Sequence, residues 1–249
     1  MKIKIFSVYY GENKKIISNK YIYPIQAGAS IIDNDLIDLK DSRYSEISLK
    51  NKYYNELSAI YTVWKDFTTE LDYIGICHYR RYFTSIIDKI LIVLSKIFKN
   101  IDIETIIYGT TFKLISKMKN YDILLPKVKK INKNVKDYYL EKHIGEHYII
   151  MEEVIKEHFE FLYETFLETS NMKIAYFLNM FILRREIFDD YCKNLFEFLC
   201  LIEEKIKIPN DMYQDRALGF LGERFFNLYF HYIKNNKNYD ILEMPIIKI

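Results

Sequence analysis

The sequence predicts an α/β fold, a sheet flanked by helices, and three observations support this. The first 80 residues alternate strand, strand, helix and strand, which is the rhythm of α/β domains. Residues 73–77 are almost entirely apolar, as in a strand that is buried on both faces. Residues 148–206 are dominated by helical patterns, so we expect a C-terminal half that is mainly helical.

The individual elements follow from periodicity, turn residues and capping signals. Strands are expected at 2–10, 21–29, 73–77, 122–126 and 179–183, with an extended tail at 239–249. Helices are expected at 57–67, 86–99, 148–168, 186–206 and 215–234. Asn55 stands where it could cap the first of these helices, and the polar residues 33–50 are interpreted as a loop.

Length and composition limit the classes of protein. A chain of 249 residues with 50% hydrophobic residues, 7 glycines and 4 prolines is expected to form one domain, 1–249. The net charge of +2 gives no reason to expect nucleic-acid binding. Cys77, Cys192 and Cys200 are too few and too scattered for a disulfide framework or a zinc site. Without a signal-peptide pattern or a membrane-spanning run, we expect a cytoplasmic protein.

Residues 86–99 have one apolar side and one polar side that includes three lysines. Such a helix usually packs its apolar side on the body of the protein. The alternative is a helix whose basic face lies on a membrane surface. Peripheral membrane contact through 86–99 is therefore an open expectation.

A dense polar cluster follows the predicted buried strand at 73–77. It consists of His78, Tyr79, Arg80 and Arg81. Ligands of open α/β sheets bind outside the carboxyl ends of strands, and guanidinium groups there favour an anion such as a diphosphate. If the strand continued, the two arginines would point to opposite sides, and one could pair with a carboxylate. The alternative for the pair is a solvated strand end.

A second group of candidates lies at 214–224. Asp215 and Glu223 would lie about 80° apart on one continuous helix, on roughly the same face as Gly219 and Gly222. Each glycine costs a helix about 1 kcal/mol relative to alanine, which indicates close approach by another element or a ligand. Glu223 and Arg224 could also be a simple surface pair.

Several well-known motifs are absent. The chain has no Walker loop, no Gly-x-Gly-x-x-Gly and no Gly-x-Ser-x-Gly, which argues against P-loop NTPases, Rossmann dehydrogenases and α/β-hydrolases. His143 and His147 are four residues apart, but Glu146 precedes the second histidine and does not follow the first, as a zincin requires. We therefore expect no metal site.

Six segments, in order along the chain, resemble the DUF4422 family of bacterial polysaccharide-biosynthesis proteins, which are placed among capsule and lipopolysaccharide glycosyltransferases. The segments are residues 23–28, 55–65, 73–83, 121–126, 179–182 and 219–224, of which the His-Tyr-Arg-Arg-Tyr-Phe block at 78–83 is the most specific. The resemblance implies a GT-A-like, Rossmann-type twisted mixed sheet. It places the nucleotide-sugar side mainly in 1–126 and the acceptor side mainly in 127–249.

The implied reaction moves a sugar from a UDP-sugar to a hydroxyl of a growing capsular or lipopolysaccharide glycan, and we expect it to proceed with inversion. Some relatives resemble galactofuranosyltransferases, so a hexofuranose is one candidate sugar and a pyranose the alternative. Another alternative is a non-catalytic protein of the same fold that binds nucleotide sugars or glycans. The acceptor could be lipid-linked, which would place the protein at the inner face of the membrane. The sequence does not indicate an oligomeric state.

Site residues follow from the resemblance together with the two polar groups above. The donor side is assigned Ser7, Val8, Tyr9, Gln26, Asn55, His78, Tyr79, Arg80 and Arg81. The acceptor side is assigned His143, Asn179, Met180 and Arg224. A carboxylate must accept the proton of the acceptor hydroxyl, and Glu223 is the first choice for this base and Asp215 the second.

The chain departs from related patterns at two places. Most GT-A enzymes have an Asp-x-Asp after this strand to hold a divalent metal, whereas this chain has His78, Tyr79 and Arg80. A protein cation can neutralise the leaving diphosphate in place of a metal, so we expect that no cofactor is required, while Mn²⁺ or Mg²⁺ stays open. The family pattern shows a histidine followed by an Asp-containing turn near 143–147, where this chain has His147.

Overall fold

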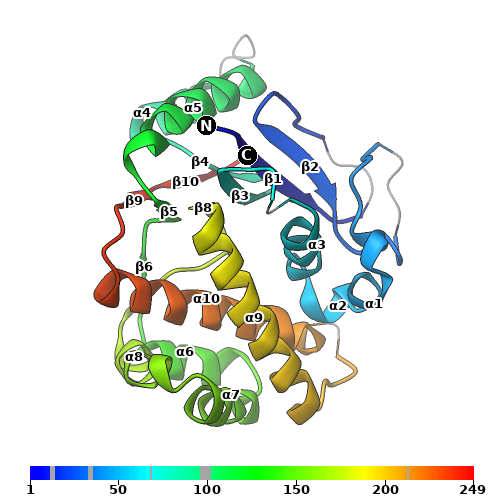
Figure 1. Ribbon diagram of the computed structural model, residues 1–249, viewed down its shortest axis with the longest axis vertical. Coiled ribbons are helices and arrows are strands. Elements are labelled where there is room, and N and C mark those ends of the chain that lie inside the picture. Colours follow the sequence, from blue (N-terminus) through cyan, green and yellow to red (C-terminus); the bar gives the residue numbers. More distant parts are fainter. Residues whose placement is uncertain (12–14, 33–35, 68, 96–101, 212) are drawn as a thin grey trace.

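A mixed sheet forms the centre of the protein in a computed structural model (Figure 1). The structure describes residues 1–249 except 12–14, 33–35, 68, 96–101 and 212. Within this part of the chain, eight strands make up the sheet. Its main run is β2 (Ile22–Gln26), β1 (Ile3–Tyr9), β3 (Tyr73–His78), β8 (Phe181–Arg184), β5 (Ile123–Pro126) and β9 (Ile241–Met244).

Strand direction determines which residues meet at the edge of the sheet. β1 is parallel to both β2 and β3, whereas β8 is antiparallel to β3 and to β5. The carboxyl ends of β1, β2 and β3 therefore lie beside the amino end of β8. We call this the carboxyl edge, and the opposite end of β3 the amino edge.

The strand at 73–78 does not continue into the arginine pair. β3 ends at His78, a turn follows, and β4 (Arg81–Phe83) runs back so that Arg81 pairs with His78. β4 also pairs with β10 (Ile246–Lys248). Arg80 therefore lies in the turn and Arg81 in the next strand, so the alternation expected for one continuous strand does not occur.

Helices cover both faces of the sheet, and two hydrophobic cores result. On one face the buried residues of β1 and β3 pack with α3 (Leu57–Phe67), α9 (Arg185–Lys205) and α10 (Ala217–Asn236). On the other face the core includes residues of α5 (Ile103–Lys117) and of α4 (Ile86–Ser95). The remaining helices α6 (Val135–Lys142), α7 (Gly145–His158) and α8 (Glu160–Asn171) lie together beside α10 (Figure 1). The predicted α/β sheet with a helical C-terminal half is confirmed.

Several boundaries differ from the sequence prediction. The loop expected at 33–50 contains a short 3-10 helix η1 (Asp41–Tyr44) and α1 (Ser45–Ser48), and α2 (Asn51–Tyr54) follows. The single helix expected at 148–168 is two helices, α7 and α8, which meet at Phe159. α5 was not predicted, and residues 96–99 of the expected helix 86–99 lie outside the described residues.

Smaller elements complete the chain. They are η2 (Met118–Asn120), η3 (Gln214–Arg216) and a two-stranded sheet of β6 (Lys129–Lys130) and β7 (Ile174–Ala175). Because η3 precedes α10, Asp215 and Glu223 do not lie on one continuous α-helix as predicted.

The two glycines of α10 allow close packing, as the sequence predicted. A Cβ on Gly219 would lie 2.2 Å from Asn55 Nδ2, and one on Gly222 would lie 2.6 Å from a methyl group of Leu57. α10 therefore packs directly on the segment that leads into α3. This contact brings Glu223 close to the start of α3.

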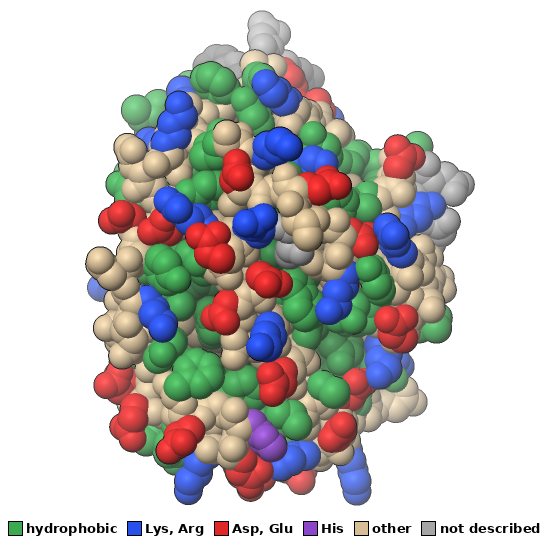
Figure 2. Space-filling view, viewed as in Figure 1, with side chains coloured by type: hydrophobic (Ala, Val, Ile, Leu, Met, Phe, Trp, Pro, Cys, Tyr) green, Lys and Arg blue, Asp and Glu red, His purple; other side chains and the backbone are tan. Residues whose placement is uncertain are grey.

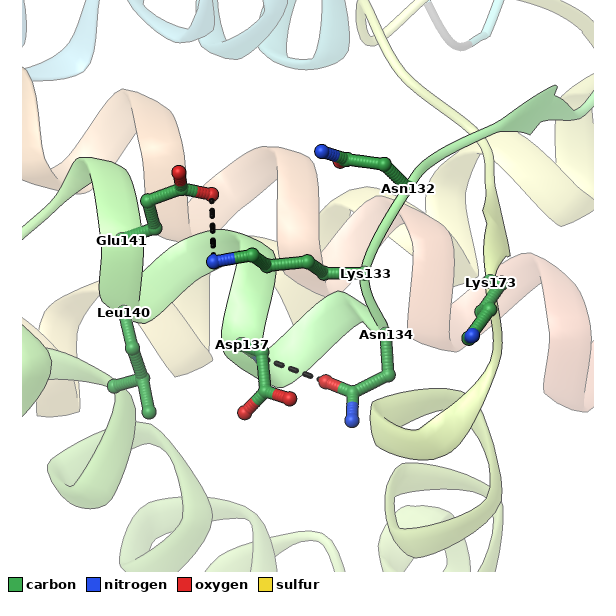
Figure 3. Close-up of a pocket in the computed structure, with 7 residues that line it drawn as sticks. All are labelled: Asn132, Lys133, Asn134, Asp137, Leu140, Glu141 and Lys173. Carbon is green, nitrogen blue, oxygen red and sulfur yellow. Dashed lines mark hydrogen bonds and ion pairs between the residues drawn. The ribbon is translucent and has the colours of Figure 1, made fainter.

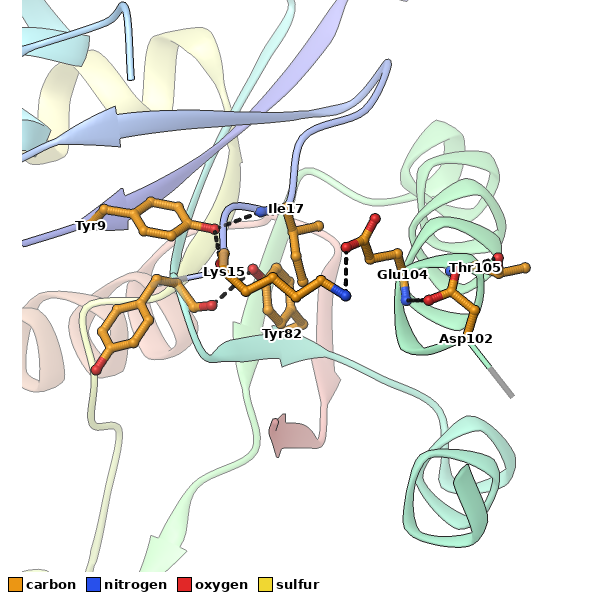
Figure 4. A network of polar contacts seen from close by, with 8 residues as sticks. Tyr9, Lys15, Ile17, Tyr82, Asp102, Glu104 and Thr105 are labelled. Carbon is orange, nitrogen blue, oxygen red and sulfur yellow. Dashed lines mark hydrogen bonds and ion pairs between the residues drawn. The ribbon is translucent and has the colours of Figure 1, made fainter. Parts of the chain in front are cut away.

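Tyr9 connects the end of β1 to the segment that follows it (Figure 4). Its hydroxyl accepts a hydrogen bond from Ile17 N at 2.8 Å, and Lys15 forms an ion pair with Glu104 of α5 at 2.8 Å. Asp102 caps α5 by accepting from the backbone N–H groups of the first turn. These contacts hold the segment 15–17 against α5.

The surface seen in Figure 2 mixes Lys and Arg side chains with Asp and Glu side chains, and hydrophobic side chains lie between them. Neither sign of charge dominates this face, which agrees with the small net charge. No helix of the described residues is both long enough and apolar enough to cross a membrane.

Candidate active site

Backbone strain is concentrated at the carboxyl edge. Among the described residues other than glycine, positive φ values occur at Asn55 (52°), Leu178 (83°) and Asn179 (44°). Asparagine tolerates this region, but a leucine with positive φ is rare. Such residues cost about 1–3 kcal/mol each and cluster at functional sites.

Hydrogen bonds hold the strained segment before β8 between three other elements. The carbonyl oxygen of Leu178 lies 2.5 Å from His78 Nε2, at the end of β3. The N–H of Leu178 donates to Glu223 Oε1 at 3.2 Å, and Asn179 Nδ2 donates to Glu56 Oε1 at 2.8 Å. The structure thus brings together His78, Asn179 and Glu223, which sequence analysis assigned from three separate motifs.

Glu223 has the chemistry of a proton acceptor. Burial raises its pKa above the usual glutamate value, and the nearby charge of Glu56 raises it further. Arg224, the N–H of Leu178 and Arg216 act in the opposite direction. A partly buried carboxylate with a raised pKa is matched to general base catalysis, because the best catalytic pKa lies near the working pH.

Asn55 does not cap α3 as predicted. Its backbone has positive φ at the end of α2, and its side-chain oxygen accepts a hydrogen bond from Arg216 Nε at 2.9 Å. Asn51 Nδ2 in turn donates to the carbonyl of Asn55 at 2.6 Å. Asn55 therefore joins α2 to the turn before α10, and Asp215 lies in that turn.

Apart from Asn55, the residues assigned to the donor side lie at the carboxyl ends of β1, β2 and β3 or in the β3–β4 hairpin. Val8 is paired with His78 and Tyr9 with Gln26 in the sheet register. Ser7, Val8 and Tyr9 are buried, and the ring of Tyr9 packs on Tyr79. These buried side chains form the layer of residues directly beneath the carboxyl edge.

Three buried donor-side atoms have no hydrogen-bond partner among the described residues. They are Ser7 Oγ, Gln26 Oε1 and Arg80 Nε. The Arg80 guanidinium also lies 5.2 Å from the ring of Tyr79. Because buried polar groups are normally paired, such atoms are candidates for ligand contacts.

The acceptor-side residues divide between two places. Met180 is fully buried at the start of β8, beside Asn179, whose side-chain oxygen is buried without a partner. Arg224 and His143 lie further along, between α6 and α10. His143 packs 4.0 Å from the ring of Phe220, and burial with the charge of Arg224 lowers its pKa to about 4.

Sequence analysis missed two residues of this site, Glu56 and Leu178. Glu56 precedes α3, where an acidic residue is expected for helix stability alone. Leu178 carries no polar side chain, and its contacts are made by backbone atoms. For Glu56, the only sequence signal was its place in the segment 55–65, which resembles the family. Leu178 had no such signal.

A cavity of about 680 Å³ lies at the start of α6, where Lys133 and Glu141 pair with each other at 3.4 Å (Figure 3). Its lining residues are separate from the site at the carboxyl edge.

In the described part of the chain, no three His, Cys, Asp or Glu side chains gather closely enough to hold a metal ion.

No curated protein matches this chain, but a solved structure and a protein family do. A solved structure described as the apo form of the bifunctional glycosyltransferase WbbM is similar, with a TM-score of 0.81 and 24% sequence identity. The match covers 100% of this chain and 45% of that one, so this chain spans less than half of its length. The family described as "Domain of unknown function (DUF4422)" matches residues 4–236, and this chain therefore belongs to the DUF4422 family.

Proposed function

We propose that the chain is a glycosyltransferase that moves a sugar from a UDP-sugar to a hydroxyl of a growing glycan, with inversion at the anomeric carbon. The observation that supports this most strongly is the position of Glu223. It combines a raised pKa with a hydrogen bond to the strained Leu178, next to the end of β3. The fold shared with a glycosyltransferase is consistent with the proposal.

The donor would lie outside the ends of β1, β2 and β3, where ligands of such sheets bind. Arg80, with His78 and Arg81 nearby in the hairpin, supplies positive charge for the diphosphate. That charge would stabilise the leaving UDP without a metal ion. The expectation of metal independence is thus part of the proposal, with Mn²⁺ and Mg²⁺ as the alternative.

The chemical step is a single displacement. The acceptor oxygen forms a bond to the anomeric carbon on the face opposite the diphosphate, and the bond to the diphosphate oxygen breaks. Glu223 accepts the proton from the acceptor hydroxyl, and UDP leaves with the bonding electron pair. Glu56 would favour this transfer because its charge raises the proton affinity of Glu223.

The proposal also covers the identity of the donor sugar and of the acceptor. We assign the acceptor to a capsular or lipopolysaccharide glycan, lipid-linked or free, and a galactofuranose-type sugar to the donor, with a pyranose as the alternative. A cytoplasmic location at the inner face of the membrane would suit a lipid-linked acceptor. Ile86, Ile87 and Ile90 of α4 are exposed, which is compatible with peripheral membrane contact there.

A donor screen tests the proposed function. The protein is incubated with UDP-, GDP-, dTDP- and CMP-sugars, with and without glycan acceptors, and released nucleotide is measured. We expect release of UDP from a UDP-hexose, increased by the acceptor. Binding of a UDP-sugar without turnover under any acceptor condition would instead support a non-catalytic nucleotide-sugar-binding protein of the same fold.

A further inference from the structure

Arg224 is a buried cation whose donors are incompletely used. Its side chain is only 4% exposed, and Nε and Nη1 have no hydrogen-bond partner among the described residues. The nearby carboxylate of Glu223 already accepts a hydrogen bond from Leu178. Removing a charge from water is costly unless it is paired, so the arrangement calls for an anion.

Aromatic rings surround the guanidinium. Its central carbon lies 5.9 Å from the ring centre of Tyr138, 5.7 Å from that of Tyr139 and 5.2 Å from that of Phe177. Ring faces attract the cation and fix its orientation, but they accept no conventional hydrogen bonds. The guanidinium is therefore held in place while part of its hydrogen-bonding capacity stays open.

Two further unpaired polar groups lie beside Arg224. His143 Nδ1 and the hydroxyl of Tyr139 are also buried without a hydrogen-bond partner in the described chain. The ring of Tyr139 lies 4.7 Å from that of His143, so the three side chains adjoin one another. We call Arg224, His143 and Tyr139 the Arg224 cluster.

The chemistry of the Arg224 cluster suits a carboxylate or a phosphate. A guanidinium can donate to two oxygens of such a group, and a neutral imidazole or a phenol can donate one more hydrogen bond. Tyr138, Phe177 and His143 are partly exposed, so the cluster lies directly beneath the surface. A neutral hydroxyl would leave the positive charge unbalanced.

The position of the cluster separates it from the donor site. Arg224 follows Glu223 on α10, and its neighbours come from α6 and from the loop before β8. The arginines of the donor side lie instead in the β3–β4 hairpin. We propose that the Arg224 cluster binds an anionic group, carboxylate or phosphate, of the acceptor glycan. This inference rests on the proposed function and adds that the acceptor is acidic.

A local NMR titration tests this inference. Protein labelled at its five histidines is titrated with sodium glucuronate, with inorganic phosphate and with glucose, against NaCl at equal ionic strength. The His143 signals are assigned from the spectrum of His143→Gln. We expect saturable shifts at His143 with both anions, none with glucose, and none at the exposed His158, which serves as an internal control.

Substitutions then connect binding to the guanidinium. Arg224→Met should weaken anion binding at least tenfold, whereas Arg43→Met, which removes an exposed arginine paired with Asp66, should not change it. Arg224→Lys keeps the charge and loses the two-pronged geometry, so we expect weakened but measurable binding, and this variant serves if Arg224→Met does not fold. Wild-type protein that binds neither anion, or Arg224→Met that binds both equally well, would overturn the inference.

Titration with UDP distinguishes the two sources of a bound anion. We expect Arg224→Met to bind UDP as the wild type does, and UDP to leave bound phosphate in place. If UDP displaces phosphate and Arg224→Met loses UDP, the cluster binds the donor diphosphate and the acceptor assignment is wrong, while the proposed function stands. If anions bind at Arg224 but no nucleotide binds anywhere, the proposed function fails and the anion site remains.

Discussion

The two edges of the sheet contain similar residues but use them differently. At the amino edge, Asp72 accepts a hydrogen bond from the N–H of Lys2 at 2.7 Å, and Arg184 pairs with Asp122 at 2.5 Å. The second oxygen of Asp122 accepts from the N–H of Asp240 at 2.9 Å. These groups pair with one another and hold chain segments together.

At the carboxyl edge, polar groups are buried without partners and the backbone is strained. Arg80, Gln26 and Asn179 each have a buried atom with no hydrogen bond in the described chain, and Leu178 and Asn179 have positive φ. Unpaired polar groups and strain both cost stability, and a protein retains them where they serve a ligand. We therefore propose that the amino edge is structural and that the carboxyl edge binds a ligand.

The largest effect is expected on turnover, which should depend on an acidic residue at the carboxyl edge and not on one at the amino edge. Glu223→Gln removes the proposed base, and turnover should fall by about 10²–10⁴-fold, while UDP binding is retained. Asp72→Asn at the amino edge keeps a hydrogen-bond acceptor and should leave turnover within about twofold of the wild type. Nucleotide release and UDP titration measure both variants, and equal turnover of Glu223→Gln and wild type would exclude Glu223 as the base.

The arginines give the second contrast. Arg80→Gln should weaken UDP binding by about 10–100-fold, because a hydrogen bond to a charged group contributes roughly 1.5–3 kcal/mol. Arg184→Gln, at the amino edge, should bind UDP normally, although it loses its ion pair with Asp122 and its contact with the ring of Tyr73. Calorimetric titration of both variants is the measurement, and the reverse order of affinities would contradict the assignment of the edges.

The glycines of two helices test the packing that positions Glu223. Gly219→Ala places a methyl group 2.2 Å from Asn55 Nδ2, and overpacking of this kind costs about 1–3 kcal/mol. Gly109 in α5 has open space around it, so Gly109→Ala should stabilise the protein by up to about 1 kcal/mol. Urea unfolding gives both values, and a stabilised Gly219→Ala would show that α10 can move away from Asn55.

The last contrast is a pH dependence at His143, which lies away from both edges. Its pKa falls from about 6.5 to about 4 on folding, chiefly because of burial. The unfolded chain then binds more protons between these values, so the contribution of His143 is present above about pH 6.5 and is lost as the pH falls toward 4. His143→Gln should show a weaker decrease in unfolding free energy over this range, and an unchanged decrease would contradict the assignment.

Local patterns predicted much of the fold and part of the site. The buried strand at 73–77 and the cationic residues that follow it could be predicted from the sequence, because a strand and its end are local features. The glycines at 219 and 222 were also informative, since their helix cost indicated the close contact that the structure contains.

The remaining features depend on contacts between distant parts of the chain. Glu56 gains its role from Asn179, which is 123 residues away, and Leu178 gains its role from backbone conformation. Asn55 does not form the expected cap. It has a positive φ, and its side chain accepts a hydrogen bond from Arg216, which is 161 residues away. Periodicity and capping rules contain no information on such pairings.

Titration of the wild-type protein with UDP in the presence of EDTA is the decisive test of a metal-independent nucleotide-sugar site at the carboxyl edge. We expect saturable binding of UDP without a divalent metal, weakened in Arg80→Gln and unaffected in Arg184→Gln. No binding with EDTA but strong binding with Mn²⁺ would contradict the proposal that arginine charge replaces the metal. No binding of UDP under either condition would contradict the assignment of the carboxyl edge as a nucleotide-sugar site.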